Sequence, residues 1–375
     1  MNILIDTTEI RLHRLNSSIP IYIRRFISHI NNNEQTNYIL LINEECKEYF
    51  TENFPGFKTV TFKFKGWNRY WHLNPKYLYN QYKFRRFLKE LEISTIFIPT
   101  DYPRYLQDKL PCKKVIVIHD LKGIKRNCHS INEAYEAYIT NKMYARLLNT
   151  SDKIIAISKY TKQDIQVYYP EIDESKIAVI YNSVVLTNTS KCPNKFNLNK
   201  YILYVNSLLK HKNISTLIKA LSKLSYEIDH NLVIVGKKTN YWEETIVPIL
   251  KQNKIEDRII HLQNITDEEL RFLYENATVF VTPSLNEGFG YTPIEAAIYK
   301  CPVISSIQEA LPDSTQGLLH YYQPAMDSDK LAIAIKNVIE TPPAKEKLEN
   351  ISEYYKKLYS IKNQVLQIQN IIQEN

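Results

Sequence analysis

The order of short apolar runs is the feature that most constrains this chain. Such runs alternate with stretches of helical periodicity in two successive rounds. Alternating strands and helices favour doubly wound, mainly parallel sheets. At 375 residues the chain also exceeds what one hydrophobic core usually supports. The predicted strands are Asn2–Ile5, Tyr38–Ile42, Thr95–Pro99, Val115–His119, Lys153–Ile157 and Ile177–Tyr181, then Tyr201–Val205, Leu232–Gly236, Ile259–Leu262, Val279–Pro283 and Pro302–Ser305.

Two α/β domains follow from this pattern. Residues 186–199 lose all periodicity and are rich in Asn, Ser and Thr, which predicts a linker. We therefore expect an N-terminal Rossmann-like domain over 1–185 and a C-terminal Rossmann-like domain over 200–343. Residues 344–375 have an amphipathic helical pattern and form the predicted tail.

The composition is that of a globular protein, with 44% hydrophobic and 23% charged residues. The net charge of +8 favours binding of anionic small molecules. No nucleic-acid-binding module is recognisable, so we expect no nucleic-acid partner. The sequence shows neither an apolar run of the ~20 residues that span a bilayer nor a signal peptide. The five cysteines are scattered without a C-x-x-C pair, so we expect reduced thiols and a cytoplasmic location.

The segment from Glu287 to Glu295 is the strongest candidate for a binding site. The chain has only seven glycines, yet Gly288 and Gly290 stand almost together here, which indicates a need for backbone freedom. A predicted strand precedes the segment, and the start of a helix, with Pro293 in its first turn, follows. Strand, glycine loop and helix N-terminus together can hold phosphate with backbone N–H groups.

This segment also carries a resemblance. The string SLNEGFGYTPIEAAIYKCPVISS resembles the signature of retaining GT-B glycosyltransferases of family 4, the glycosyl transferases group 1, and of their mannosyltransferase-like members. The resemblance extends over most of 115–340 and is weaker before 115. Its other motifs are VIVIHDL (115–121), SDKIIAISKYTKQDI (151–165), KIAVIYNS (176–183), ILYVNSLLKHKNISTLIKAL (202–221), LVIVGKK (232–238) and ITDEELRFLYENA (265–277).

The resemblance implies a fold of two Rossmann-like domains facing a cleft, with the last helix crossing back to the first domain. It also implies transfer of a sugar from a nucleotide diphosphate, with retention at the anomeric carbon. Lys212 would stabilise the leaving diphosphate, Glu287 would contact the donor sugar near the reacting carbon, and His119 would hydrogen-bond the donor sugar. The implied donor-binding residues are Glu295, which we place in the first helical turn and assign to the ribose diol, with Gly290, Tyr291, Thr292, Asn206, Ser207 and Lys210.

Each implied role has a simpler structural alternative. Lys212 and Glu287 could be solvated charges, and Glu295 an ordinary helix-start acid. Ser158 could contact donor or acceptor, but its position favours a helix N-cap. Asp120 more simply orients its loop. Ser17 and Ser18 complete the acceptor or cleft candidates, which are Ser17, Ser18, Asp120 and Ser158.

Two departures from the family pattern concern phosphate binding. Asn206-Ser207 stands where many members have Gly-Arg, so that Lys210, Arg11 or Arg14 would have to substitute for the arginine. Asn16-Ser17-Ser18 stands where the family often has Gly-Gly. These departures keep a second hypothesis open, namely a weak or inactive glycosyltransferase-like partner that only binds nucleotide sugar.

We expect no metal and no cofactor. Asp327-Ser-Asp329 resembles a metal-binding D-x-D, but its position before a predicted helix favours an N-cap. No His/Cys set has zinc spacing.

Residues 62–87 combine Lys and Arg with many aromatic residues and contain no Asp or Glu. This composition is typical of contact with an anionic membrane surface, where a polyprenyl-linked acceptor would be found. The alternative is a loop that lines the acceptor site, followed by a helix with core-facing aromatics. The predicted function is therefore transfer of a sugar from a UDP- or GDP-sugar to a glycan or lipid-linked glycan in cell-surface polysaccharide biosynthesis, on the inner face of the membrane.

Overall fold

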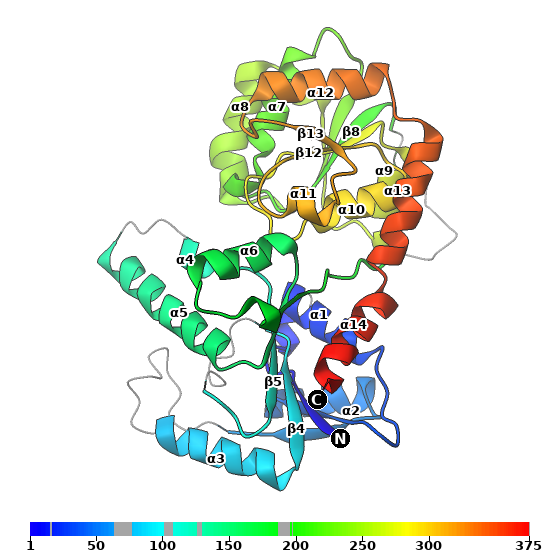
Figure 1. Ribbon diagram of the computed structural model, residues 1–375. Coiled ribbons are helices and arrows are strands. Elements are labelled where there is room, and N and C mark those ends of the chain that lie inside the picture. Colours follow the sequence, from blue (N-terminus) through cyan, green and yellow to red (C-terminus); the bar gives the residue numbers. More distant parts are fainter. Residues whose placement is uncertain are drawn as a thin grey trace. The chain divides into compact units, whose positions relative to one another are not determined.

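The computed structural model describes residues 1–15, 17–63, 77–100, 108–125, 130–186, 196 and 198–374 (Figure 1). The chain divides into two compact units, of which the first contains 1–182 and 361–375 and the second contains 183–360. The predicted tail at 344–375 is thus shared between them. Most of the predicted linker lies outside the described residues.

A parallel seven-stranded sheet forms the centre of the first unit, in the order β3-β2-β1-β4-β5-β6-β7. This order reverses direction between β1 and β4, as in a Rossmann-like fold. Its central strands read as nearly continuous buried runs because helices cover both faces. The strands are β1 (Asn2–Asp6), β2 (Asn37–Ile42), β3 (Lys58–Thr61), β4 (Ile93–Ile98), β5 (Lys113–Ile118), β6 (Lys153–Ala156) and β7 (Ile177–Val179).

The helices of this unit pack their apolar sides on the sheet. They are α1 (Ser18–Ile27), α2 (Lys47–Asn53), α3 (Tyr77–Glu90), α4 (Lys122–Lys125), α5 (Ile131–Asn149) and α6 (Lys159–Tyr168), joined by α14 (Ile361–Gln373) from the other end of the sequence. α14 lies beside α1 (Figure 1). Gln369 donates a hydrogen bond to the Tyr38 hydroxyl, and Lys113 donates one to the Ile371 carbonyl. These bonds anchor α14 to the first sheet.

A parallel six-stranded sheet forms the second unit, in the order β10-β9-β8-β11-β12-β13. The order again reverses at its centre, between β8 and β11. The strands are β8 (Tyr201–Val205), β9 (Asn231–Val235), β10 (Ile259–Leu262), β11 (Val279–Thr282), β12 (Val303–Ser306) and β13 (His320–Tyr322). The helices are α7 (Ile214–Lys223), α8 (Val247–Asn253), α9 (Asp267–Asn276), α10 (Tyr291–Ile298), α11 (Leu311–Ser314), α12 (Ser328–Glu340) and α13 (Lys345–Leu358).

The second core is formed mainly by α7, α12 and one face of the sheet. Leu217, Leu221, Ile234 and Leu331 are completely buried in it. α13 packs on α10, and Ser352 of α13 donates a hydrogen bond to the Ile298 carbonyl at the end of α10. α13 therefore stabilises the position of α10, the helix that carries part of the predicted donor site.

Candidate functional site

The reversal point of the second sheet brings three sequence-predicted residues together. Asn206 follows β8, Lys212 lies in the 3-10 turn Lys210–Lys212 after it, and Glu287 follows β11. Since β8 and β11 are neighbouring parallel strands, the segments after them emerge at one edge. Ligands of open α/β sheets bind at the carboxyl ends of strands, where the order reverses. This edge is the candidate site.

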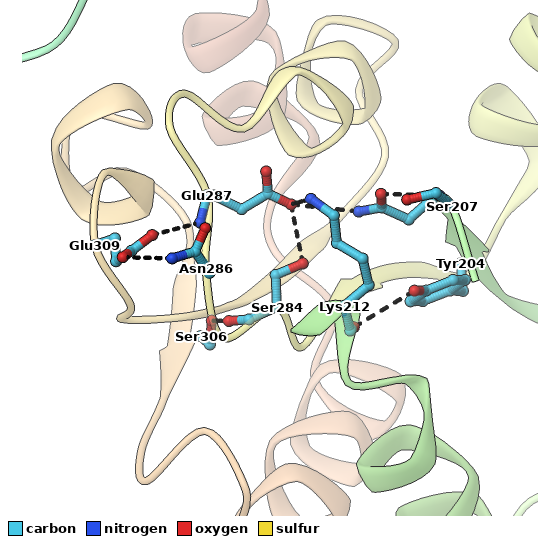
Figure 2. Close-up of polar contacts among 9 residues, drawn as sticks. Tyr204, Ser207, Lys212, Ser284, Asn286, Glu287, Ser306 and Glu309 are labelled. Atoms are coloured by element: carbon cyan, nitrogen blue, oxygen red, sulfur yellow. Dashed lines mark hydrogen bonds and ion pairs between the residues drawn. The ribbon is translucent and has the colours of Figure 1, made fainter. Parts of the chain in front are cut away.

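Lys212 and Glu287 form an ion pair, with Nζ 2.6 Å from Oε1 (Figure 2). Their side chains are only 12% and 13% exposed. The Tyr204 hydroxyl lies 3.4 Å from the Lys212 carbonyl oxygen. Burial, then the Glu287 charge, raises the pKa of Tyr204. An ammonium group has three N–H donors, so Lys212 can bind Glu287 and anionic oxygens at the same time.

Three donors converge on the same oxygen of Glu287. Besides Lys212, the Ser284 hydroxyl lies 3.0 Å and the Asn206 amide 3.3 Å from Oε1. Within the described part of the chain, no hydrogen bond reaches Oε2. The arrangement thus fixes the carboxylate through one oxygen and leaves the second for a ligand. Asn206-Ser207 stands where many members of the family have Gly-Arg, and here Asn206 donates a hydrogen bond to the Glu287 carboxylate.

Lys212 is placed by its neighbour Asn213. Asn213 adopts a left-handed conformation with φ 55° and precedes α7. Its buried side-chain amide donates hydrogen bonds to the carbonyls of Pro283 and Ala325, at 3.0 and 2.9 Å. The Leu285 amide in turn donates to the His211 carbonyl. These contacts tie the Lys212 turn to the loop that carries Glu287.

That loop is also held from β12. The Glu309 carboxylate accepts hydrogen bonds from the Asn286 side-chain amide at 2.7 Å and from the Glu287 main-chain amide at 2.8 Å. Ser306 donates a 2.6 Å hydrogen bond to the Ser284 carbonyl (Figure 2). Sequence patterns did not single out Ser284, Asn286 or Glu309, because their roles depend on contacts across the sheet edge.

Gly290 has a backbone conformation that favours glycine, with φ 87°. A Cβ at this position would lie 2.7 Å from Cδ2 of Leu311, so the Leu311 side chain would have to shift to admit it. α10 starts at the next residue, and no side chain caps it. The N–H groups of Tyr291 and Thr292 belong to its first turn, where main-chain N–H groups have no intrahelical acceptor. This end of α10 therefore suits an anion.

Glu295 lies in the second turn of α10, not in the first as predicted. The helix begins at Tyr291, two residues before the predicted start, and this shifts Glu295 inward. Its Oε2 accepts a 3.2 Å hydrogen bond from the buried Tyr274 hydroxyl of α9. Burial, then the Glu295 charge, raises the pKa of Tyr274 well above its usual value. The helix dipole therefore acts on Glu295 less than expected, and Tyr274 orients it.

Ser207 and Lys210 are both exposed beside this cluster. The Ser207 amide donates to Oδ1 of Asn206 at 2.9 Å, and this turns the Asn206 amide group toward Glu287. Among the predicted substitutes for the missing arginine, Arg11 lies in the first unit, 4.0 Å from the Glu45 carboxylate. Lys210, by contrast, is two residues from Lys212 in the same turn.

In the first unit, His119 and Asp120 follow β5, at the carboxyl edge of the sheet. The His119 ring meets the Tyr22 ring of α1 edge to face, with centroids 5.0 Å apart. Its Nε2 is 3.2 Å from the Pro99 carbonyl, which only accepts, so Nε2 carries the hydrogen. The Asp120 carbonyl lies 3.5 Å from the Tyr144 hydroxyl. His119 is thus oriented by two neighbours.

The three serines predicted for the acceptor or cleft are all at helix starts. Ser158 is the N-cap of α6, and its hydroxyl accepts from the Thr161 amide at 3.0 Å, which confirms the N-cap interpretation. Ser17 precedes α1 and donates to the Arg14 carbonyl instead of capping the helix. Ser18 is the first residue of α1 and is exposed. Asn16 lies outside the described residues.

Asp327 is also an N-cap, as expected. Its Oδ1 accepts hydrogen bonds from the amides of Asp329 and Lys330 at the start of α12. Asp329 instead contacts Lys223. Across the described ranges, no group of three or more His, Cys, Asp or Glu residues is placed to hold a metal ion.

The predicted membrane-contact segment is described only at 62–63 and from Tyr77 onward. The alternative of core-facing aromatics applies to Phe84, which is completely buried. Other side chains of α3 face outward, and Leu78 is 77% and Tyr82 65% exposed. A surface cavity of about 520 Å³ beside them is lined by Tyr82, Arg85, Arg86, Lys89, Lys109, Leu110 and Pro111. No helix among the described residues is both long and apolar enough to cross a bilayer.

The sequence of this chain matches known protein families. Residues 188–358 match the family model of glycosyl transferases group 1, and residues 47–188 match glycosyltransferase family 4. The chain belongs to this family of GT-B glycosyltransferases.

Individual relatives agree with this assignment. The O-antigen chain mannosyltransferase RfbU of Salmonella typhimurium is 32% identical over 257 residues, covering 66% of this chain and 69% of the relative. The N-acetylgalactosamine-N,N'-diacetylbacillosaminyl-diphospho-undecaprenol 4-alpha-N-acetylgalactosaminyltransferase of Campylobacter jejuni is 24% identical, covering 69% and 74%. The fold of sucrose-phosphate synthase from Thermosynechococcus elongatus superimposes with a TM-score of 0.72 at 18% identity, covering 99% and 98%.

Proposed function

We propose that this protein transfers a hexosyl group, with retention, from a nucleotide diphosphate sugar to a glycan or lipid-linked glycan during cell-surface polysaccharide synthesis. The observation that carries the proposal is the buried Lys212–Glu287 pair at the reversal point of the second sheet. The relatives named above transfer mannose to an O-antigen chain and N-acetylgalactosamine to an undecaprenyl-linked sugar, by their names. This chain would act on an acceptor of the same class.

The chemistry follows from charge. When the bond between the anomeric carbon and the phosphate oxygen breaks, negative charge develops on the departing diphosphate. The ammonium group of Lys212 and the N–H groups of Tyr291 and Thr292 would stabilise that charge, because donors fixed in place before reaction need no reorganisation. Lys210 would add to them in place of the arginine.

The sugar end of the donor would meet Glu287. Oε2 would accept a hydrogen bond from a sugar hydroxyl, while Oε1 stays with Lys212. Glu295 would bind the ribose diol and His119 the donor sugar, as the family resemblance implies. The acceptor hydroxyl would attack on the face that the diphosphate leaves, and its proton would pass to a departing phosphate oxygen. Retention and independence from metal ions are parts of this proposal.

Peripheral contact with an anionic membrane is a further part. It is supported by the exposed Leu78, Tyr82, Arg85, Arg86 and Lys89 of α3, which combine apolar and cationic groups on one surface. A protein bound to the membrane through this surface of α3 would meet a lipid-linked acceptor at the inner face of the membrane.

The test is a panel of GDP- and UDP-sugars, with release of nucleoside diphosphate as the measurement. We expect one donor to be consumed, at equal rates with and without EDTA, and the product to keep the anomeric configuration of the donor by NMR. Binding of donors without any turnover, with or without acceptor lipids, would instead support the inactive partner hypothesis. Loss of turnover in EDTA that manganese restores would contradict metal independence.

A further inference from the structure

The main chain of Glu287 is hydrogen-bonded as well as its side chain. Its N–H group donates to Oε2 of Glu309 at 2.8 Å, and its carbonyl accepts from the Ala310 amide at 3.3 Å. Both contacts come from two consecutive residues in the loop that follows β12. The loop at 309–310 therefore forms hydrogen bonds with both polar main-chain groups of Glu287.

Glu309 uses both of its carboxylate oxygens in this contact. Oε1 accepts from the Asn286 side-chain amide at 2.7 Å while Oε2 binds the Glu287 amide (Figure 2). Hydrogen bonds to an ionised carboxylate are roughly twice as strong as neutral ones. The side chain of Glu309, in the loop after β12, thus binds two adjacent residues, Asn286 and Glu287, in the loop after β11.

The backbone of Glu309 indicates that this contact has a cost. Glu309 adopts a left-handed conformation, with φ 49°, which glycine or asparagine would adopt more easily. A glutamate kept there needs compensation elsewhere, and the two hydrogen bonds supply it. Local backbone preference alone would favour glycine, whereas the carboxylate of Glu309 makes two hydrogen bonds that glycine could not make.

We propose that Glu309 is a positioning residue that sets the direction of the Glu287 side chain through its main chain. This rests on the proposed function, in which Glu287 contacts the donor sugar. Glu309 touches the main chain of Glu287 and the side chain of Asn286, so it acts through another residue. A displacement of about 1 Å at a reacting group can cost about 100-fold in rate.

The first measurement needs no catalytic activity. The Glu287 amide should exchange slowly with deuterium in the parent protein, because its hydrogen is bonded to Glu309. Glu309→Ala should raise the exchange rate of this amide at least about tenfold. In the variant the amide hydrogen has lost its acceptor, so no hydrogen bond to Glu309 has to open before exchange. Unchanged exchange, with the thermal midpoint preserved, would overturn the proposal.

The second measurement uses turnover. Glu309→Ala should lower kcat about 10- to 100-fold, the range expected for a misplaced reacting group, with a smaller effect on the donor KM. Binding of free nucleoside diphosphate should change less than threefold, roughly, since Lys212 and α10 remain. A loss confined to KM, or one that follows the fraction of unfolded protein, would show a merely structural role.

A charge-conserving double variant supplies the control. Glu309→Gln alone keeps one acceptor oxygen for the Glu287 amide but turns an N–H group toward the Asn286 amide. Combining it with Asn286→Asp gives that N–H group a carboxylate acceptor and restores the total charge. We expect the pair to recover most of kcat, whereas each single variant does not; failure of the pair in a folded protein with unchanged diphosphate binding would count against positioning by these bonds. Absence of turnover in the parent protein would refute the proposed function, and the exchange measurement would still decide whether Glu309 holds the main chain of Glu287.

Discussion

Lys212 and Glu287 lie 75 positions apart in the sequence, yet Nζ and Oε1 are 2.6 Å apart beyond the carboxyl ends of the central strands of the second sheet. Adjacent strands β8 and β11 deliver them to one edge. The two charges satisfy each other in a site that is largely shielded from water. Mutation can therefore separate what this ion pair contributes to stability from what Lys212 and Glu287 contribute to catalysis.

Lys212→Met should lower turnover by about 100- to 1,000-fold, because it removes a fixed donor to the departing diphosphate. It should also lower the free energy of unfolding by about 2 kcal/mol, since Glu287 would remain partly buried without its counter-ion. Turnover is measured by nucleoside diphosphate release and stability by urea unfolding.

The double variant Lys212→Met with Glu287→Met should regain most of that stability, because neither charge remains, but none of the activity. Lys223→Met is the matched control: it removes the exposed Lys223–Asp329 pair, whose side chains are 43% and 73% exposed. It should change turnover and the free energy of unfolding little. Equal losses in the Lys212 and Lys223 variants would contradict a special role for the buried pair.

Gly290→Ala should destabilise the protein by about 2 kcal/mol, because alanine is strained at φ 87° and its Cβ would press on Leu311. It should also weaken binding of nucleoside diphosphate, since the start of α10 would shift. Gly317→Ala is the control, with φ 67° and no heavy atom within 4 Å of the added Cβ. We expect it to cost about 1 kcal/mol and to leave binding unchanged. Identical binding in the two variants, measured by calorimetry, would refute the anion role of the α10 start.

Asp6 gives a pH dependence to the stability of the first unit. It is 2% exposed at the end of β1, and burial raises its pKa to about 6 from an ordinary 3.8, although Thr8 donates two hydrogen bonds to Oδ1. The folded state therefore holds this proton at pH values where the unfolded state has lost it. The contribution of Asp6 to stability is largest below about pH 4, falls as pH rises and is lost above about pH 6.

Asp6→Asn should accordingly raise the free energy of unfolding at pH 7.5 by about 3 kcal/mol, given a shift from 3.8 to about 6 and about 1.4 kcal/mol for each unit of pKa. It should have little effect at pH 4. Urea unfolding at both pH values, followed by a probe in the first unit, measures this. Asp173→Asn, at an exposed cap whose pKa is lowered by its bond to Ser175, should not stabilise at pH 7.5. A gain at both pH values would exclude the titration of Asp6 as the cause.

Replacing Arg85 and Arg86 by Glu should abolish flotation with vesicles that contain anionic lipid, since each cation near such a surface contributes about 1 kcal/mol of attraction. Flotation of the parent protein should weaken with salt and disappear with purely zwitterionic lipid. Replacing Lys336 and Lys356 of the second unit by Glu makes the same change in charge elsewhere and should leave flotation intact. No flotation of the parent protein would remove membrane contact from the proposal.

The sequence predicted both sheets because their central strands are buried on both faces and appear as continuous apolar runs. Two edge strands were not predicted. β3 and β13 are short and only partly buried, so their sequences, Lys58–Thr61 and His320–Tyr322, lack such a run. Strand pairing at a sheet edge decides them, and pairing is a long-range property.

The site was predictable only where a family motif marks it. Lys212 and Glu287 stand in such motifs, and the structure joins them directly. The contacts of Glu309 and Tyr274 depend on which segments lie next to each other: Glu309 stands in none of the quoted motifs, and the motif that contains Tyr274 does not indicate that it contacts Glu295. The error at Glu295 has a local cause: a glycine N-cap let α10 begin at Tyr291, ahead of the proline that indicated its start.

The return of α14 to the first sheet has a consequence for biosynthesis. Residues 361–373 leave the ribosome only after the whole of 183–360, so the second unit is complete before the first can acquire its final helix. Until then, the surface around Tyr38 and Lys113 stays uncovered on a nascent chain. The amino-terminal half should therefore mature only after the second unit has been synthesised, so its folding cannot be completed in the order in which the two halves are made.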